Sequence, residues 1–187
     1  MSVRIRPATG DDVDAIAEVQ VETWRTAFRG IVADETLDRM SVAQRIGRWH
    51  AALASETGIA FVAEAERGDS PAVVGFVDGG TNRYAEPPYD AFTGELRAIY
   101  VLDSHQRDGT GTRLVRALVD RLLEAGHRTM VVWTLETSPF RAFYERLGGR
   151  LVGSREVRID DLPYAGVAYG WDDLAALRQR LGSDGRS

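Results

Sequence analysis

The sequence predicts an α/β fold of the α+β type, in which helices cover a mixed β-sheet, from three observations. Apolar, β-prone runs alternate along the chain with runs whose apolar residues recur at helical spacing. The order of these runs, β-α-α-β-β-β-α-β-α-β-β, implies a mixed sheet wrapped by helices. The 187 residues, 44% of them hydrophobic, are enough for one domain with a substantial core. We expect that domain over residues 1–181, with a polar, disordered tail at 182–187.

Alternation, helical spacing and turn residues predict the elements of the first half. In order, these are an edge strand Val3–Arg6, a helix from Val13 to Phe28, two helices within Asp34–Ala54, and hairpin strands Ile59–Ala65 and Ala72–Asp78. Thr9 and Asp12 form an acidic version of the capping box before the first helix. A second capping-box pattern at Ser41 favours two short helices over one long one. The polar residues 66–70 predict the hairpin turn.

The second half is predicted to alternate strands and helices. In order, these are a loop Gly79–Phe92, a strand from Glu95, a helix Gly111–Ala125, a strand Thr129–Leu135, a short helix ended by Gly148-Gly149, strands Arg150–Ile159 and Gly166–Trp171, and a helix Asp172–Leu181. Ser138 or Thr137 is expected to cap the short helix, with Pro139 in its first turn. The length of the loop Gly79–Phe92 favours a lid or a substrate wall.

Composition excludes several classes of site and partner. The chain has no cysteine, which excludes disulfides, thiolate metal sites and a cysteine-linked acyl intermediate. All 23 basic residues are arginine, which excludes a Schiff-base or P-loop lysine. The net charge of −5 argues against bulk nucleic-acid binding, and no apolar stretch is long enough to span a membrane. We expect a cytoplasmic monomer or homodimer with no nucleic-acid or membrane partner. The histidines, His50, His105 and His127, lack metal-ligand spacing, so we expect no metal site.

The most informative segment is Gly94–Gly111, with the sequence GELRAIYVLDSHQRDGTG. It predicts a strand, a short polar loop and a helix that starts at glycines. Such a turn exposes backbone N–H groups at the positive end of a helix, where an anion binds. Glycine allows the backbone to come close to a ligand. The segment therefore predicts a site for a phosphorylated cofactor, although a Rossmann fingerprint does not fit, because Leu114 stands where a small residue is needed.

Two motifs in this part of the chain resemble the GNAT superfamily of N-acetyltransferases. Gln106, Gly109 and Gly111 match its acyl-CoA signature, Gln/Arg-x-x-Gly-x-Gly/Ala, between a strand and a helix. Further along, Phe143–Gly148 (FYERLG) matches the second motif of the family. The resemblance extends from Val3 to about Trp171. It implies the GNAT fold, a mixed, mostly antiparallel sheet of six to seven strands whose central parallel strands splay apart.

The resemblance also implies acetyl-CoA as co-substrate, without a metal. In the family, the pantetheine arm lies in the cleft between the two splayed strands, and backbone N–H groups after the first of them bind the pyrophosphate. The implied cofactor-binding residues are Ile99, Tyr100, Val101, Gln106, Arg107, Asp108, Gly109, Thr110, Gly111, Thr112, Ser138 and Phe143. Three residues depart from the family pattern. Ser138 replaces the usual asparagine, and Gly149 stands where the family favours phenylalanine. Asp108 brings a carboxylate close to the expected pyrophosphate, a charge that Arg107 or Arg141 could offset.

The resemblance implies two catalytic residues. Glu95, eleven residues before Gln106, matches the glutamate that acts as base in several family members, often through water. Partial burial between apolar neighbours would favour that role; the alternative is a carboxylate in a salt bridge, for example with Arg97. Tyr144 matches the tyrosine whose hydroxyl points at the CoA sulfur and donates a proton to the thiolate. The alternative for Tyr144 is a core aromatic beside Phe143. Backbone N–H groups near Tyr100 or Val101 would bind the oxyanion.

The identity of the acceptor stays open at this point. Trp24, Phe28 and Tyr84 fall where GNAT proteins build the acceptor wall, so we expect them to bind substrate; core packing or a subunit interface is the alternative. The expected function is acetyl transfer from acetyl-CoA to a primary amine of a small molecule or peptide by direct attack in a ternary complex. A protein N-terminus, a free amino acid, a polyamine and an aminoglycoside all fit. The alternatives are a catalytically silent acyl-CoA-binding sensor and a dinucleotide oxidoreductase.

Overall fold

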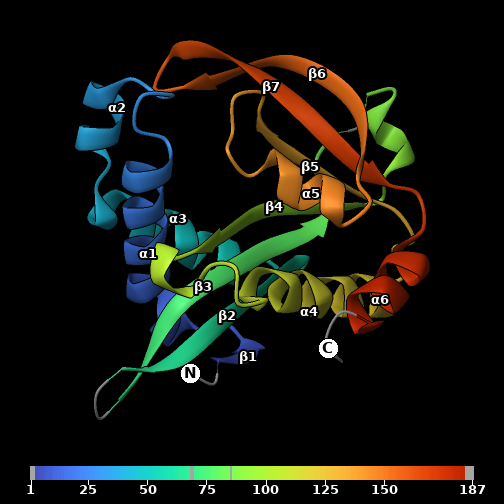
Figure 1. Cartoon of the computed structure of the whole chain (residues 1–187), viewed down its shortest axis with the longest axis horizontal. Coiled ribbons are helices and arrows are strands. Elements are labelled where there is room, and N and C mark those ends of the chain that lie inside the picture. The colour runs from blue at the N-terminus through green and yellow to red at the C-terminus, as the bar shows by residue number, and fades with distance from the viewer. Residues whose placement is uncertain (1–2, 68–69, 85, 184–187) are drawn as a thin grey trace. The chain divides into compact units, whose positions relative to one another are not determined.

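The structure, a computed structural model, describes residues 3–67, 70–84 and 86–183 (Figure 1). The chain divides into two units, the first comprising Met1–Gly79 and Ala98–Leu118, and the second comprising Gly80–Arg97 and Val119–Ser187. The expectation of one domain over residues 1–181 stays a prediction. The expected tail at 182–187 is wrong for its first two residues, because Gly182 and Ser183 belong to the last helix. Residues 184–187 lie outside the described residues.

The first unit contains three helices and the N-terminal edge of the sheet. Its elements are β1 (Val3–Pro7), α1 (Val13–Ala27), α2 (Asp34–Arg39), α3 (Val42–Leu53), β2 (Gly58–Arg67) and most of β3 (Ser70–Thr81). The Asp12 carboxylate accepts a hydrogen bond from the Thr9 backbone N–H at 2.7 Å, which confirms the predicted cap before α1. Ser41 is the N-cap residue of α3, so the predicted break between two short helices is also confirmed.

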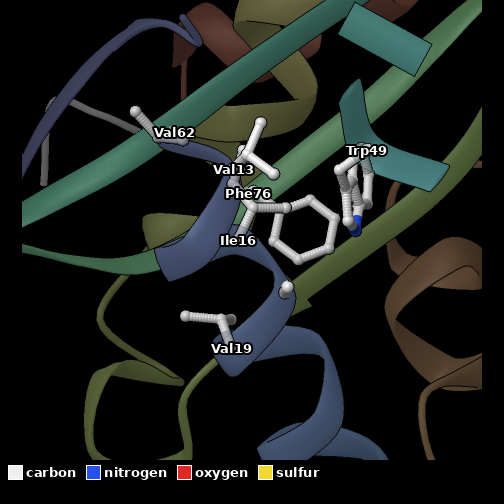
Figure 2. Close-up of a cluster of buried hydrophobic side chains, with 7 residues drawn as sticks. Val13, Ile16, Val19, Trp49, Val62 and Phe76 are labelled. Carbon is white, nitrogen blue, oxygen red and sulfur yellow. The ribbon is translucent and has the colours of Figure 1, made fainter. Parts of the chain in front are cut away.

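A cluster of buried side chains joins α1 and α3 to the strands of the first unit (Figure 2). Its large members are Val13, Ile16, Val19, Trp49, Val62 and Phe76. The rings of Trp49 and Phe76 meet edge to face, with centroids 4.9 Å apart. The Trp49 indole N–H, which would be costly to bury unpaired, donates to Gln20 Oε1 at 2.9 Å. The helical spacing of the apolar residues in α1 thus produces one face that packs against the sheet.

The second unit contains the C-terminal strands and helices. Its complete elements are β5 (Met130–Leu135), α5 (Arg141–Arg146), β6 (Arg150–Ile159), β7 (Leu162–Trp171) and α6 (Leu174–Ser183). Three elements contribute to both units: β3, whose last two residues belong to the second unit, β4 (Gly94–Val101) and α4 (Thr110–Glu124). β4 and β5 pair in parallel over three residues, from Gly94 opposite Met130 to Leu96 opposite Val132. Arg97 and Trp133 come next in this unit and are described, yet they are not in the ladder, as expected where two strands begin to splay.

All seven strands belong to one sheet, in the order β1-β2-β3-β4-β5-β7-β6. The pairs β1–β2, β5–β7 and β6–β7 are antiparallel, whereas β4–β5 is parallel. The predicted mixed, mostly antiparallel sheet of six to seven strands is therefore confirmed. β1 lies at one end of the strand order, so its prediction as an edge strand is correct.

Three strands are longer than predicted by more than one residue. β2 and β3 extend to Arg67 and Ser70, inside the predicted hairpin turn, and β3 continues to Thr81, inside the predicted loop. β7 begins at Leu162 instead of Gly166, because Asp160 and Asp161 have φ of 52° and 64° and form a two-residue turn after β6. The proline after Leu162 is tolerated, because this part of β7 pairs with β6 alone in the described register.

The predicted start of α5 is wrong. The helix begins at Arg141, with Phe140 in the N-cap position. Ser138 instead accepts the Phe140 backbone N–H on its Oγ at 3.2 Å, which closes a separate turn before the helix. The predicted end is correct, because Gly148 has a φ of 80° and donates its N–H to the Glu145 carbonyl at 2.8 Å.

Candidate active site

The turn between β4 and α4 lies in the first unit and has the backbone of an anion site. Arg107 and Gly109 have φ of 62° and 86°, on either side of Asp108. Alternation of left-handed residues with others is the pattern of backbone concavities that bind anions. Gln106 Nε2 donates to the Val101 carbonyl at 2.9 Å and so ties the turn to the end of β4. α4 starts at Thr110, so the predicted residues Thr110, Gly111 and Thr112 form its first turn, where backbone N–H groups lack partners within the helix.

Asp108 places a negative charge inside this turn. Its Oδ1 accepts the Thr110 backbone N–H at 2.9 Å, one of the groups predicted to bind pyrophosphate. Desolvation acts to raise the pKa of Asp108, but its hydrogen bonds with Thr110 outweigh this effect and the pKa is lowered. Of the two arginines expected to offset this charge, Arg141 is engaged elsewhere, with the Tyr169 hydroxyl at 2.9 Å and the Glu136 carbonyl at 2.9 Å.

The end of β4 carries the three residues predicted to contact the pantetheine through their main chain, Ile99, Tyr100 and Val101. The Tyr100 side chain packs on Phe76, with ring centroids 5.5 Å apart, and its hydroxyl accepts the Trp24 indole N–H at 2.8 Å. Burial raises the pKa of the Tyr100 phenol. Tyr100 is therefore a packed, neutral tyrosine, which leaves its backbone as the part that can serve a ligand.

Trp24 and Phe28, predicted to bind the acceptor, lie together at the end of α1. Their ring centroids are 4.8 Å apart, and Trp24 lies 6.5 Å from Tyr100. Phe28 is buried, whereas Trp24 is half-buried. Trp24 is thus the more accessible of the two. The alternative of core packing fits Phe28 better than Trp24.

Glu95 lies in the second unit, deeply buried and ion-paired. Its side chain is 2% exposed, and its two oxygens accept hydrogen bonds from Arg83 Nη2 at 2.7 Å and Arg83 Nε at 2.8 Å. The Arg83 backbone N–H adds a third contact at 3.3 Å. The expected neighbour Arg97 is a weaker partner, since its Nε lies 3.8 Å from Glu95 Oε2. The salt-bridge alternative is therefore present, but with Arg83 as the main partner.

Tyr144 lies on α5 with its side chain buried against other aromatic rings. Its ring centroid is 5.9 Å from that of Tyr169 and 6.5 Å from that of Trp171. Tyr169 is itself fixed, because its hydroxyl donates to Glu145 Oε1 at 2.7 Å and accepts from Arg141. Burial, together with the Glu145 contact, raises the pKa of Tyr169. Arg141 and Glu145, both on α5, thus fix the Tyr169 ring against which Tyr144 packs.

The two remaining residues of the second unit that are predicted to bind the cofactor, Ser138 and Phe143, lie on either side of the start of α5. Phe143 is half-buried and meets Tyr144 edge to face, with centroids 5.5 Å apart. Ser138 is 6% exposed, and its hydroxyl is used by the turn that precedes the helix. Ser138, which is shorter than the asparagine usual in the family, therefore makes a hydrogen bond within the protein itself.

Tyr84, the third predicted acceptor residue, packs in the second unit. Its ring lies 5.6 Å from that of Trp133, and the Arg155 guanidinium carbon lies 4.1 Å from the centroid of each of these rings. Sequence patterns did not predict the contacts of Trp133, Arg155, Arg83 or Tyr169. All four make their contacts with residues of other segments. The only sign of such contacts in the sequence is that Trp133 and Arg155 lie within runs predicted to be strands.

Neither a metal site nor a membrane span is found where the structure is described. Residues 3–67, 70–84 and 86–183 contain no group of three or more His, Asp or Glu side chains that could hold a metal ion. Over the same residues, no helix has the length and apolarity required to cross a bilayer. His105 Nδ1 lies 2.9 Å from Ser104 Oγ. Partial burial lowers the pKa of His127, which is therefore neutral at pH 7.

Comparison with known proteins identifies the family. Residues 73–159 match the model of the FR47-like protein family. The chain is 34% identical over 179 residues to the uncharacterized N-acetyltransferase YuaI of Bacillus subtilis, covering 96% of this chain and 98% of YuaI. A GCN5-related N-acetyltransferase from Rhodopseudomonas palustris has a similar fold, with a TM-score of 0.69 at 17% identity over 91% of this chain and 95% of that one. The Salmonella typhimurium protein yncA, solved with its cofactor acetyl-CoA, gives a TM-score of 0.64 at 19% identity over 93% and 95% of the two chains. The chain therefore belongs to the GNAT superfamily of N-acetyltransferases.

Proposed function

We propose that this protein transfers an acetyl group from acetyl-CoA to a primary amine of a small molecule or peptide, by direct attack in a ternary complex. The observation that carries the proposal is the turn after β4, where two left-handed residues precede the first-turn N–H groups of α4, which have no acceptor within the helix itself. A backbone of this kind suits a diphosphate and requires no lysine. The shared fold of yncA, which binds acetyl-CoA, supports the same cofactor here.

In this proposal, backbone groups do most of the cofactor binding. The N–H groups from Arg107 to Thr112 hold the pyrophosphate, and each bond to a charged oxygen contributes about 1.5–3 kcal/mol. Gln106 acts indirectly, because its bond to Val101 fixes the turn. The main chain of Ile99, Tyr100 and Val101, with Ser138 and Phe143, contacts the pantetheine.

The proposed reaction needs one proton to leave the amine and one to reach the sulfur. The neutral amine nitrogen attacks the thioester carbon, and a backbone N–H near Tyr100 or Val101 stabilises the oxyanion. The C–N bond forms, the C–S bond breaks, and the thiolate takes a proton from the Tyr144 hydroxyl. The proton lost by the amine passes through water to Glu95. The products are the amide and the CoA thiol.

The surroundings of Glu95 restrict how it can serve as base. An ionised carboxylate has about four lone-pair sites. Arg83 occupies three of them with its two guanidinium N–H groups and its backbone N–H. One site is left for a water molecule, which fits a base that acts through water and does not touch the amine.

The same ion pair favours the second candidate, a CoA-binding module without turnover. A carboxylate that serves only to hold Arg83 would be structural, and the protein would bind acetyl-CoA and transfer nothing. The experiment is thiol release from acetyl-CoA with a panel of amines, together with calorimetry of CoA binding, for the wild type, Tyr144→Phe and Tyr89→Phe. Tyr89 is also a buried tyrosine and serves as the control for loss of a hydroxyl.

An enzyme that uses Tyr144 as acid should lose about 100-fold or more in kcat in Tyr144→Phe, with an unchanged Kd for CoA and with normal turnover in Tyr89→Phe. Tight CoA binding without turnover of any amine would establish the second candidate, and no binding of CoA would end both. We further propose a cytoplasmic location, which the absence of cysteine suits, and a monomer or homodimer.

A further inference from the structure

The hairpin formed by β6 and β7 of the second unit can be followed in Figure 1. A pocket of about 510 Å³ lies against this hairpin. Its charged and polar lining comes from Ser154, Arg155 and Glu156 of β6, Tyr164 of β7, and Glu136, which follows β5. The volume falls in the range of pockets that bind small molecules. None of these residues has a role in the transfer chemistry proposed above.

Arg155 is held in the angle between two aromatic rings. Its guanidinium carbon lies 4.1 Å from the ring centroids of both Tyr84 and Trp133, and those rings are 5.6 Å apart and tilted by 57°. Contact with two ring faces stabilises the cation and fixes the plane of the guanidinium. A guanidinium fixed in this way is ready to bind a planar carboxylate without losing further side-chain freedom.

Two N–H donors of Arg155 and Trp133 lack acceptors. Within the described part of the chain, Arg155 Nε and Trp133 Nε1 are both buried without a hydrogen-bond partner. A buried donor that stays unpaired costs about 1–3 kcal/mol. Both groups are donors and one belongs to a cation, so an acceptor with negative charge would complement them. Of the two residues, Arg155 lines the pocket.

The pocket is connected to the proposed catalytic residues within the same unit. Arg83, which pairs with Glu95, directly precedes Tyr84, which contacts Arg155. On the other side, the backbone carbonyl of Glu136 accepts a hydrogen bond from Arg141 of α5, the helix that carries Tyr144. Glu136 and the residues next to Arg155 are therefore linked, by sequence neighbours or hydrogen bonds, to the segments that carry Glu95 and Tyr144.

We propose that this pocket binds the carboxylate of the amine acceptor, with Arg155 as the recognition group. The inference rests on the proposed acetyltransferase function and narrows its substrate class to amines that also carry a carboxylate, such as amino acids and short peptides. Glu136 and Glu156 line the same pocket, so its three charged side chains sum to −1 (one positive and two negative). A net charge of −1 suits a zwitterion better than a simple anion. Polyamines and aminoglycosides carry no carboxylate that Arg155 could bind.

The test compares each of the twenty protein L-amino acids with its carboxamide as acceptor, in the thiol-release assay with acetyl-CoA. The variants are Arg155→Gln, Arg155→Lys and, as control, Arg150→Gln, which makes the same change on the same strand at a residue that pairs with Asp172 and does not line the pocket. We expect the wild type to prefer the best amino acid over its amide by about tenfold or more in kcat/KM. Arg155→Gln should lower kcat/KM for the acid by about 10- to 100-fold, the equivalent of one lost charged hydrogen bond, and for the amide by less than about threefold. Arg155→Lys should lie between the two, and Arg150→Gln should match the wild type.

Equal losses for acid and amide in Arg155→Gln, or a wild type that acetylates amides or polyamines as well as acids, would overturn the inference. If CoA binds but no amine is turned over, the proposed transfer fails and the pocket is tested by calorimetry instead. The amino acids are then titrated into the CoA complexes of the wild type and Arg155→Gln. Binding by the wild type alone supports the carboxylate site, and binding by neither, or by both equally, overturns it.

Discussion

Replacing Arg83 should destabilise the protein more than replacing its partner Glu95, although Arg83 is the more exposed of the two. The Arg83 side chain is 58% exposed and that of Glu95 is 2% exposed. Arg83→Gln leaves a buried carboxylate without the two hydrogen bonds of 2.7 and 2.8 Å that satisfy it. Breaking a buried pair in this way costs about 3–5 kcal/mol. The Arg83 backbone N–H and the more distant Arg97 remain, so we expect about 2–4 kcal/mol here.

Glu95→Gln should cost only about 1–2 kcal/mol, because its amide oxygen still accepts a bond and the exposed guanidinium regains water. The double variant should be close to Glu95→Gln alone, since it removes the unpaired charge. Arg121→Gln is the matched control. The Arg121 side chain is 56% exposed, almost as much as that of Arg83, but its partner Glu124 is 61% exposed. Loss of that surface pair should cost less than about 1 kcal/mol.

The measurement is urea unfolding at pH 7, with the free energy of unfolding extrapolated to water for each variant. The reasoning predicts the order Arg83→Gln, Glu95→Gln, Arg121→Gln, from most to least destabilised. If Arg83→Gln costs no more than Arg121→Gln, burial of the Glu95 carboxylate does not set the energy of this pair and the account is wrong.

Two further changes follow from the charged groups of the first unit. Asp12→Asn should lower stability by about 2 kcal/mol at pH 7. The Arg6 hydrogen bond is the main cause of the lowered pKa of Asp12, so the contribution is complete above the unfolded pKa near 4 and disappears as pH falls through the folded value. Unfolding measured from pH 7 to pH 2 should therefore show the gap between variant and wild type closing below about pH 4, and a constant gap would contradict the ion-pair explanation. Asp108→Asn removes a negative charge from the β4–α4 turn and keeps an acceptor for the Thr110 N–H, so the Kd for CoA should fall by about fivefold at low salt, equivalent to about 1 kcal/mol. Calorimetry that finds weaker or unchanged binding would show that the phosphates do not approach Asp108.

Local signals in the sequence predicted most of the fold. The break at Ser41 and the end of α5 at Gly148 depend on residues within one turn of each feature, and both are present in the structure. The start of α5 was misplaced because Ser138 has two local options, a helix cap and a turn before the helix, and packing selects the turn. The motif positions Gln106 to Gly111 were readable because the turn that they form is itself local.

The partners of the site residues could not be predicted in the same way. Glu95 pairs with Arg83, which lies in a loop twelve residues earlier, although the sequence offered Arg97 as the nearer cation. Arg155 reaches Trp133 from a different strand, and only the sheet order brings the two together. Such contacts depend on tertiary packing, and no spacing rule along one segment predicts them.

Every ion pair described in this protein has an arginine as its cation, and the sequence contains no lysine at all. A guanidinium stays protonated in proteins and so does not act as a nucleophile toward a thioester, whereas a lysine amine would. The charged contacts that hold this fold together are therefore of a kind that acetyl-CoA does not modify. A bound acetyl donor therefore meets no lysine side chain of this protein that could compete with the amine substrate for the acetyl group.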